Sequence, residues 1–171
     1  AGAFSDNSLK LMADYNEQPI IFPLSNPTSN CERPPEEIYR ITEGRALVAT
    51  GSPFKDVGFQ GNSYRIAQCN NAFIFPGLGL GVVAMKCTKL TQNMLWVACK
   101  ALANYPIKDD ALLPTLNEAY SVSRQVAFAV AMQAIEDGVT KIESPEKIWE
   151  FIDEIVWEPK YYTYKKPQKA L

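Results

Sequence analysis

Histidine is absent from all 171 residues of the sequence. Its absence excludes Ser-His and Cys-His nucleophilic devices built within the chain. It also excludes histidine-ligated metal sites and a histidine general base. Any chemistry in this chain therefore depends on lysine, tyrosine and carboxylate side chains, or on groups that another polypeptide segment supplies.

A long uncharged apolar run, a basic patch and a secretory leader are also absent. The longest apolar stretch covers residues 72–85 and contains one proline and three glycines, so it is shorter than a membrane span of about 18 residues. The formal net charge is −2, and both signs are spread evenly, unlike the basic footprint of a nucleic-acid binder. The opening AGAFSDNS has no basic n-region. We expect neither a membrane nor a nucleic acid as a partner.

Paired cysteines with metal-ligand spacing are missing as well. No CxxC occurs, and the four cysteines are widely spaced, which makes a zinc site improbable. An even count is compatible with disulfides, but nothing in the sequence indicates secretion. We therefore expect four reduced, mostly buried thiols in a cytoplasmic protein. They are Cys31, Cys69, Cys87 and Cys99.

The first third of the chain has the pattern of a parallel α/β sheet. Ser5 is placed to cap a helix over residues 6–15, with Leu9, Met12 and Ala13 on one face. Residues 19–24 and 46–50 are short apolar runs that predict buried strands, separated by a helix over residues 36–42. Because a helix opens the chain, we expect an earlier strand to be missing and the chain to be clipped from a larger protein.

The remainder is mostly helical. Residues 57–66 predict a small hairpin, and the chain turns helical from Asn70. Further helices are expected over residues 91–104, 117–137 and 144–154, followed by an aromatic tail. The centre of the longest helix, residues 126–132, is apolar all round and is therefore expected to be buried on several sides.

Gly77, Gly79 and Gly81 have two interpretations. Backbone N–H groups freed of side chains can hold a pyrophosphate at a helix N-terminus. However, the spacing is GxGxG rather than GxGxxG, and no ribose-binding acid follows about 20 residues later. Close packing of one helix on another is therefore favoured.

Two asparagine motifs lie where a ligand of an α/β sheet would bind. Asn26, within the 25–28 segment SNPT, follows the first apolar strand, and ligand crevices lie outside the carboxyl ends of strands. Its amide can donate and accept at once, but an Asx-turn before proline explains it equally well. Asn70 and Asn71 begin the glycine-rich helix, so both can be caps, or one can cap while the other contacts a ligand.

For two further clusters, a structural role is favoured over ligand binding. Asp109 and Asp110 could ligate a metal, but they lie in a polar loop with no other acid nearby. The terminal tail interleaves aromatic and basic residues, which is compatible with single-stranded nucleic acid. Packing of these rings onto another part of the protein is favoured. The tail residues concerned are Trp157, Lys160, Tyr161, Tyr162, Tyr164, Lys165, Lys166 and Lys169.

Three ordered motifs closely resemble malic enzymes. They are IIFPLSNPTS at 20–29, TEGRALVATGSPF at 42–54 and QCNNAFIFPGLGLGVV at 68–83. The similarity spans essentially the whole chain. The motifs resemble those of the bacterial NAD-linked enzymes, which are related to malolactic enzyme. The resemblance implies the C-terminal part of a subunit about three times longer.

The resemblance implies an activity and a set of site residues. Malic enzymes oxidise L-malate with NAD or NADP and decarboxylate the product to pyruvate and CO2, with Mg²⁺ or Mn²⁺ stabilising the enolate. Asn26 and Asn71 correspond to residues that contact the substrate. The nicotinamide side is assigned to Gly2, Ala3, Ser25, Asn26, Asn70 and Asn71. The family's catalytic tyrosine and lysine, its metal ligands and its GxGxxG loop correspond to none of these residues, so neither a catalytic nor a metal-binding residue is assigned here, and the chain alone is expected to be inactive.

The fold expected is α/β, a partial parallel-sheet, Rossmann-like cofactor domain that is N-terminally truncated and followed by several packed helices and the tail. Residues 1–140 are assigned to the NAD(P)-binding domain and 141–171 to an appendage. The partners expected are L-malate, the remaining N-terminal part of the enzyme and further copies of the subunit in a homo-oligomer. NAD is favoured over NADP. Malolactic chemistry and a non-catalytic α/β binding module remain alternatives.

Overall fold

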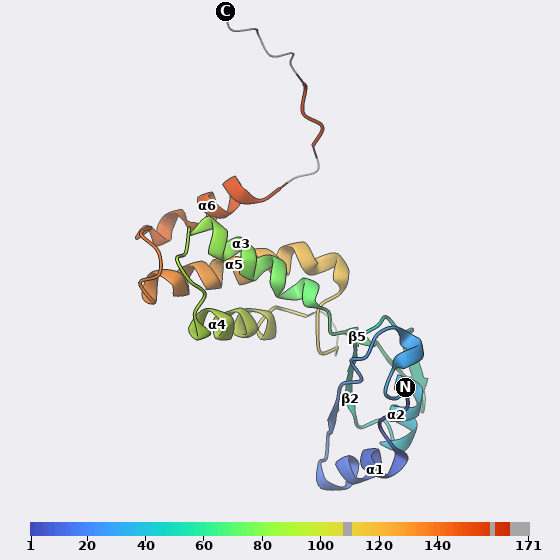
Figure 1. The fold of residues 1–171 in the computed structure, drawn as a ribbon. Coiled ribbons are helices and arrows are strands. Elements are labelled where there is room, and N and C mark those ends of the chain that lie inside the picture. Colours follow the sequence, from blue (N-terminus) through green and yellow to red (C-terminus); the bar gives the residue numbers. More distant parts are fainter. Residues whose placement is uncertain (108–110, 158–159, 165–171) are drawn as a thin grey trace, which may run out of the picture.

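The computed structural model describes residues 1–107, 111–157 and 160–164, arranged in two lobes (Figure 1). Each lobe has a hydrophobic cluster of its own. The buried residues of one cluster lie between Leu9 and Ile66, and those of the other lie between Phe73 and Ile152. The lobes are joined where β5 (Ala67–Gln68) leads into α3 (Phe75–Ala84), near Asn70.

The N-terminal lobe contains the predicted parallel sheet. The order is β1 (Ile20–Ile21), β2 (Leu47–Thr50), β5, and both pairings are parallel, with Ile20 opposite Leu47 and Ala49 opposite Ala67. Along the chain, the segment that joins β2 to β5 forms the predicted hairpin, with strands β3 (Val57–Phe59) and β4 (Asn62–Tyr64). The third parallel strand, β5, has only two residues and was not expected.

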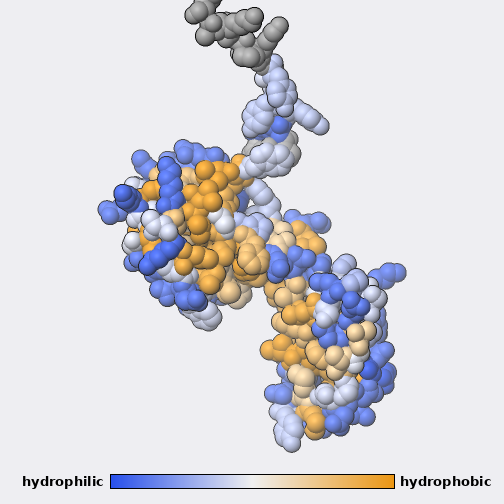
Figure 2. Space-filling view, viewed as in Figure 1, coloured by the Kyte–Doolittle hydropathy of each residue, from blue (hydrophilic) through white to orange (hydrophobic). Residues whose placement is uncertain are grey.

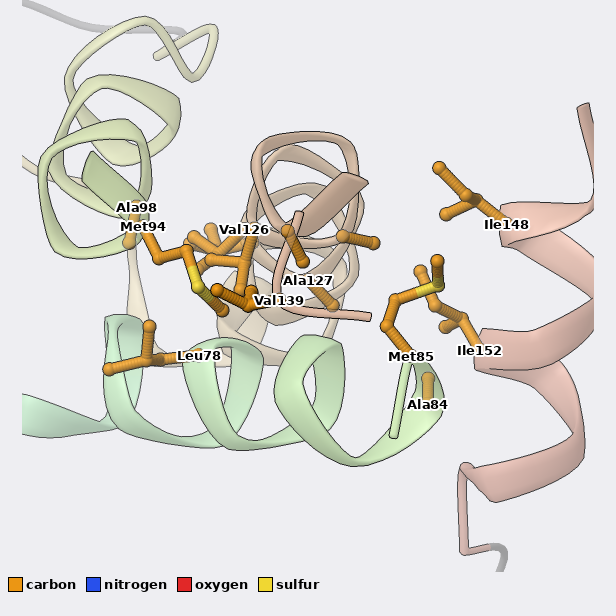
Figure 3. Packing of buried hydrophobic residues seen from close by; sticks show 14 of the residues in the cluster. Leu78, Ala84, Met85, Met94, Ala98, Val126, Ala127, Val139, Ile148 and Ile152 are labelled. Carbon is orange, nitrogen blue, oxygen red and sulfur yellow. The ribbon is translucent and has the colours of Figure 1, made fainter. Parts of the chain in front are cut away.

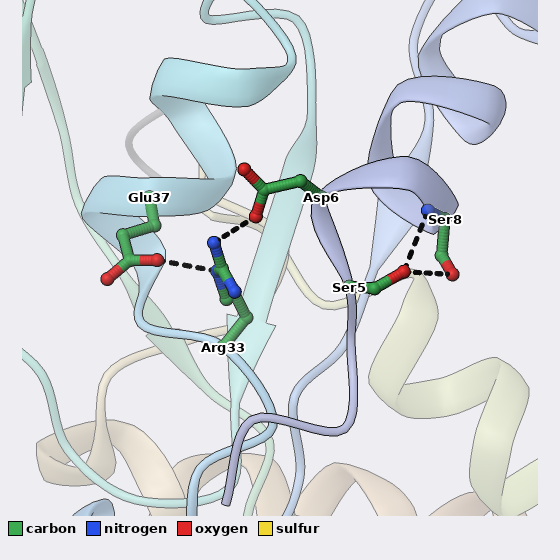
Figure 4. A network of polar contacts seen from close by, with 5 residues as sticks. All are labelled: Ser5, Asp6, Ser8, Arg33 and Glu37. Carbon is green, nitrogen blue, oxygen red and sulfur yellow. Dashed lines mark hydrogen bonds and ion pairs between the residues drawn. The ribbon is translucent and has the colours of Figure 1, made fainter.

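Helices α1 (Asp6–Tyr15) and α2 (Pro35–Ile41) contribute Leu9 and Ile38 to the core beside Ile21 and Val48 of the sheet. Ser5 caps α1 as predicted, because its hydroxyl accepts a bond from the Ser8 N–H at 3.1 Å. Arg33 ties the two helices together, pairing with Asp6 and with Glu37, whose Oε2 is 2.5 Å from its Nε (Figure 4).

One burial prediction in this lobe was wrong. The 19–24 run is not a fully buried strand, since only two of its residues pair and the burial alternates. Ile21 is 2% exposed, whereas Ile20 is 59% exposed. Ile20 belongs to the edge strand β1, and period-two alternation places it on the face opposite that of Ile21. On the predicted apolar face of α1, Leu9 and Ala13 are buried, while Met12 is 37% exposed.

The second lobe is a helical bundle around α5 (Ala119–Glu136). Helices α3, α4 (Gln92–Ala103) and α6 (Ile148–Ile155) pack against it, and Met94, Val126 and Ile148 meet in one core (Figure 3). Thr91 caps α4 as predicted, accepting from the Met94 N–H at 3.1 Å. No residue between Val126 and Ile135 is exposed, so the prediction that this stretch is buried on several sides is confirmed. Short 3₁₀ turns precede three of these helices, at Asn71–Phe73, Leu116–Glu118 and Pro145–Lys147.

Two of the three glycines in α3 lie at the contact with α5. A Cβ at Gly77 would lie 2.5 Å from the Ser123 carbonyl oxygen, and one at Gly81 would lie 2.7 Å from that of Ala127. Side chains four residues apart share one face of a helix, so this face of α3 is smooth enough for the two backbones to approach. The helix-packing interpretation is confirmed for Gly77 and Gly81, while Gly79 faces open space.

The chain after α6 leaves the bundle. Ile148 and Ile152 belong to the same core as α3 and α5, and Trp149 stacks on Phe128 with ring centroids 4.7 Å apart. By contrast, the rings of Tyr161, Tyr162 and Tyr164 are exposed, so the expected packing of the tail does not occur among the described residues. Lys165, Lys166 and Lys169 lie outside the described part of the chain, as do Asp109 and Asp110.

Candidate functional site

Three loops meet at the carboxyl edge of the sheet. They follow β1, β2 and β5, and the middle one is bonded to the segment after β1 and to the last residue of β5. The Gly51 N–H donates to the Pro23 carbonyl at 3.0 Å, and the Gln68 Nε2 donates to the Gly51 carbonyl at 3.1 Å. Parallel strands bring their carboxyl ends to one edge, where ligands of open α/β sheets bind. The predicted residues Ser25, Asn26, Asn70 and Asn71 all lie on these loops.

Asn26 is exposed, and its side chain is held on one side only. Its Oδ1 accepts a hydrogen bond from the hydroxyl of Ser52, which is 5% exposed. Within the described chain, no group accepts a hydrogen bond from its Nδ2. The amide therefore has a donor available to a ligand.

Asn70 and Asn71 divide two tasks. The Asn70 Oδ1 accepts from the Ala72 N–H at 2.9 Å, so Asn70 caps the 3₁₀ turn that leads into α3. Asn71 is exposed and makes no side-chain hydrogen bond to any described residue. Its amide donor and acceptor are both available at the edge of the sheet.

Ser25 is engaged by an acid that the sequence did not single out. Its hydroxyl donates to Glu32 Oε1 at 2.5 Å, and its N–H donates to the same carboxylate at 3.1 Å. The hydrogen bond from the Ser25 hydroxyl is the main cause that keeps the pKa of Glu32 below its usual range, and the bond from the Ser25 N–H acts in the same direction. Ser25 thereby orders the loop, and its ligand role remains a prediction.

Gly2 and Ala3 run beside this loop. The Gly2 N–H donates to the Cys31 carbonyl at 3.1 Å, and the Phe4 N–H donates to the Glu32 carbonyl at 3.3 Å. Gly2 has φ of 75°, a left-handed conformation that favours glycine. Both Gly2 and Ala3 are exposed, so their backbones are accessible near Ser25.

The described residues do not form a site for Mg²⁺ or Mn²⁺. Among them, no cluster of three histidine, cysteine, aspartate or glutamate side chains is placed to hold a metal ion, whereas these cations need several oxygen ligands. Nor do the glycines of α3 form a pyrophosphate cradle, because Gly77 and Gly81 are occupied by α5. A nicotinamide carboxamide is complementary to exposed amides and backbone groups such as those of Asn26 and Asn71, so this edge is compatible with that end of the cofactor.

A further hollow lies away from this edge. A cavity of about 620 Å³ opens at the amino ends of the strands, near Gln18 and Leu47. Tyr39 and Tyr64 stack in its wall, with ring centroids 4.3 Å apart. Burial, chiefly, raises the pKa of Tyr39 to about 12, so this phenol stays neutral and is a poor proton-transfer group near neutral pH.

The four thiols are free, as predicted, but their burial differs from the prediction. Cys31 is buried, Cys87 is half-buried, and Cys69 and Cys99 are exposed. Desolvation raises the pKa of the Cys69 thiol, which disfavours the reactive thiolate. In the described part of the chain, no helix is long and apolar enough to cross a membrane.

Sequence reasoning missed Glu32, Ser52 and Gln68 at this edge. Ser52 could have been found, because GSP follows the apolar run 46–50 in the same way that SNP follows the run 19–24. Glu32 and Gln68 carry no such signal, since their roles depend on contacts across loops.

Comparisons with known proteins agree with this geometry. The family model described as "Malic enzyme, NAD binding domain" matches residues 1–135. The chain is 49% identical over 169 residues to the NAD-dependent malic enzyme of Aliivibrio fischeri and 45% identical to that of Acinetobacter baylyi, covering 96% of this chain and 30% of each relative. The chain thus spans about 30% of the length of these curated relatives.

Solved structures lead to the same family. A crystal structure of Entamoeba histolytica malic enzyme matches with a TM-score of 0.66 at 30% identity, over 90% of this chain and 30% of that one. The malic enzyme of Pyrococcus horikoshii matches with a TM-score of 0.66 at 26% identity, over 91% of this chain and 34% of that one. The parallel sheet, the loops at its carboxyl edge and these matches lead to one conclusion: the chain belongs to the malic enzyme family and includes part of its NAD-binding domain.

Proposed function

We propose that the full-length protein catalyses the NAD-linked oxidative decarboxylation of L-malate to pyruvate and CO2, and that this segment completes the substrate and nicotinamide side of its active site. The observation that carries the proposal is the pair of exposed amides, Asn26 and Asn71, at the carboxyl edge of the sheet of a malic enzyme family member.

The two asparagines are suited to an anionic hydroxy acid. The Asn26 Nδ2 is available to donate to a substrate carboxylate, and the Asn71 amide can donate to a carboxylate or accept from a hydroxyl while remaining neutral. Neutral amides hold malate without competing for a metal ion. Asn70 orients Asn71 by capping the turn that carries it.

Asn26, Asn71 and the residues beside them would hold the nicotinamide end of NAD, which would supply the hydride acceptor for this oxidation. NAD is preferred to NADP in this proposal because the relatives in Aliivibrio and Acinetobacter are named NAD-dependent. Gly2, Ala3 and Ser25 border the nicotinamide side together with the asparagines. The Mg²⁺ or Mn²⁺ ligands and the groups that transfer protons are assigned to the rest of the polypeptide.

The test is product analysis with the full-length protein, L-malate, Mn²⁺ and NAD. Reduced cofactor and pyruvate in equal amounts are expected. Lactate without net cofactor reduction would instead indicate malolactic chemistry, and the absence of turnover and binding would leave the non-catalytic module.

Three further assignments belong to the same proposal. The cytoplasm is supported by four free thiols. A homo-oligomer is supported by exposed apolar side chains on both lobes, including Phe22 and Val83. The division into a cofactor-domain part, residues 1–140, and an appendage, residues 141–171, remains a prediction.

A further inference from the structure

Ser52 is a buried hydroxyl whose backbone is fixed by its surroundings. The Thr50 hydroxyl donates to the Ser52 carbonyl at 2.8 Å, and the preceding residue, Gly51, is bonded to Pro23 and to Gln68. A Cβ at Gly51 would lie 2.0 Å from the Leu24 carbonyl oxygen, so the loops after β1 and β2 are in direct contact. The position of the Ser52 backbone is therefore set by the sheet, and its Oγ lies within hydrogen-bonding distance of Asn26.

This hydroxyl contacts one end of the Asn26 amide. It donates to Oδ1, which directs Nδ2 away from Ser52. An asparagine amide has an acceptor at one end and two donors at the other, and a half-turn about χ2 exchanges them. A fixed neighbour that donates to Oδ1 favours one of the two orientations.

We propose that Ser52 is a positioning residue, which holds the Asn26 amide so that its NH2 group faces a carboxylate of the substrate. The inference rests on the proposed function, because it takes a carboxylate as the ligand of Asn26. Without Ser52, the amide is free to turn its oxygen toward the carboxylate, where two acceptors repel each other.

The first measurement compares Ser52→Ala with wild type in the full-length enzyme. The kcat/KM for malate should fall about 3- to 10-fold, as expected for one neutral hydrogen bond, while the thermal midpoint changes little. Ser29→Ala is the matched control, since this exposed serine lies three residues from Asn26 on the segment after β1, and its hydroxyl has no hydrogen bond to a described residue. It should leave every parameter unchanged.

A double-mutant cycle separates positioning from a structural role. If Ser52 acts through Asn26, Ser52→Ala introduced into Asn26→Ala should change kcat/KM by less than about 1.5-fold. Losses that multiply independently would overturn the inference.

The orientation itself is tested by Asn26→Asp, which keeps the shape but replaces the donor with an acceptor. Its loss should exceed that of Asn26→Ala, and a variant as active as wild type would contradict the proposed orientation. The Asn26→Asp measurement still tests the orientation of the Asn26 amide if the Ser52→Ala variant does not fold.

Malate binding, measured by calorimetry with Mn²⁺ and NAD present, separates a failure of the proposed function from a failure of the positioning role of Ser52. Wild type that binds malate without turning it over refutes the proposed function, while the affinities of the variants still test Ser52. Wild type that binds no malate refutes both.

Discussion

Asn70 and Asn71 are adjacent in the chain but have different surroundings, and substitutions should separate them. Asn71→Ala in the full-length enzyme should leave the fold intact and lower kcat/KM for malate roughly 10- to 150-fold, the loss of a hydrogen bond to a charged substrate. Asn70→Ala should instead cost about 1 kcal/mol of stability, because the Ala72 N–H loses its cap. Steady-state kinetics and thermal unfolding of both variants provide the check, and exchanged phenotypes would reverse the assignment.

Local chemistry made the capping role of one asparagine predictable, since a cap involves residues two or three apart. The link between Ser52 and Asn26 was beyond such reasoning. These residues are separated by 26 positions, and they meet only because β1 and β2 pair in a particular register. Residue pairs of this kind depend on tertiary structure, which a single sequence does not specify directly.

Among the elements, α3 owes its packing against α5 to its glycine spacing. Gly81→Ala should destabilise the 171-residue chain by about 1–3 kcal/mol, because its Cβ would collide with Ala127 and Val130 of α5. Gly79→Ala is the matched control, since it meets open space and should stabilise the helix by up to about 1 kcal/mol. Circular dichroism melts measure both, and equal effects would contradict the packing role of Gly81.

Asp137 connects two helices and should make their packing pH-dependent. Its carboxylate accepts from the Thr91 hydroxyl, and from Asn93 and Gln133 at 2.9 Å each. These bonds, that of Thr91 first, hold the pKa of Asp137 below its usual range. A depressed pKa adds stability above the unfolded value near pH 4, and this stability is lost as pH falls through the folded value.

Asp137→Asn should therefore lower the melting temperature at about pH 6, and the difference from wild type should shrink toward about pH 3. A difference that is constant with pH would show that the charge of Asp137 is not what matters.

The strands were harder to predict than the helices for a physical reason. Helix signals such as Ser5 and Thr91 are local, whereas β5 has two residues and no periodicity to detect. The exposure of Ile20 on β1 was also missed. An apolar run predicts a buried strand, but it does not show whether other elements cover both faces of that strand.

At the scale of the whole molecule, the 171-residue chain should not turn over malate. The described residues offer amides and backbone groups at the sheet edge but no cluster of metal ligands. With malate, Mn²⁺ and NAD, reduced cofactor should not form above background. A turnover number on the order of 10 s⁻¹, which is typical of enzymes, would contradict the assignment of the chemistry to the rest of the polypeptide.

The same chain should self-associate. Hydrophobic side chains gather on the helical lobe and on one side of the N-terminal lobe (Figure 2). The exposed apolar side chains of the two lobes include Ile20 on β1 and Phe22 beside it, and Phe75 and Val83 on α3, with exposures of 37–62%. An unpaired edge strand with apolar neighbours is a template for pairing with another chain. Sedimentation velocity should therefore show species larger than a monomer that increase with concentration.

Ile20→Lys tests whether the sheet edge is responsible. Ile20 is 59% exposed and lies outside the core, so a lysine should be tolerated there while its charge disfavours edge-to-edge pairing. The variant should shift the distribution toward monomer at unchanged helical content. Tyr15→Lys is the matched control, because it adds the same charge at a position on α1 that is 84% exposed. If both substitutions dissolve the larger species equally, net charge rather than the β1 edge controls association, and wild type that sediments as a monomer at all concentrations contradicts the prediction.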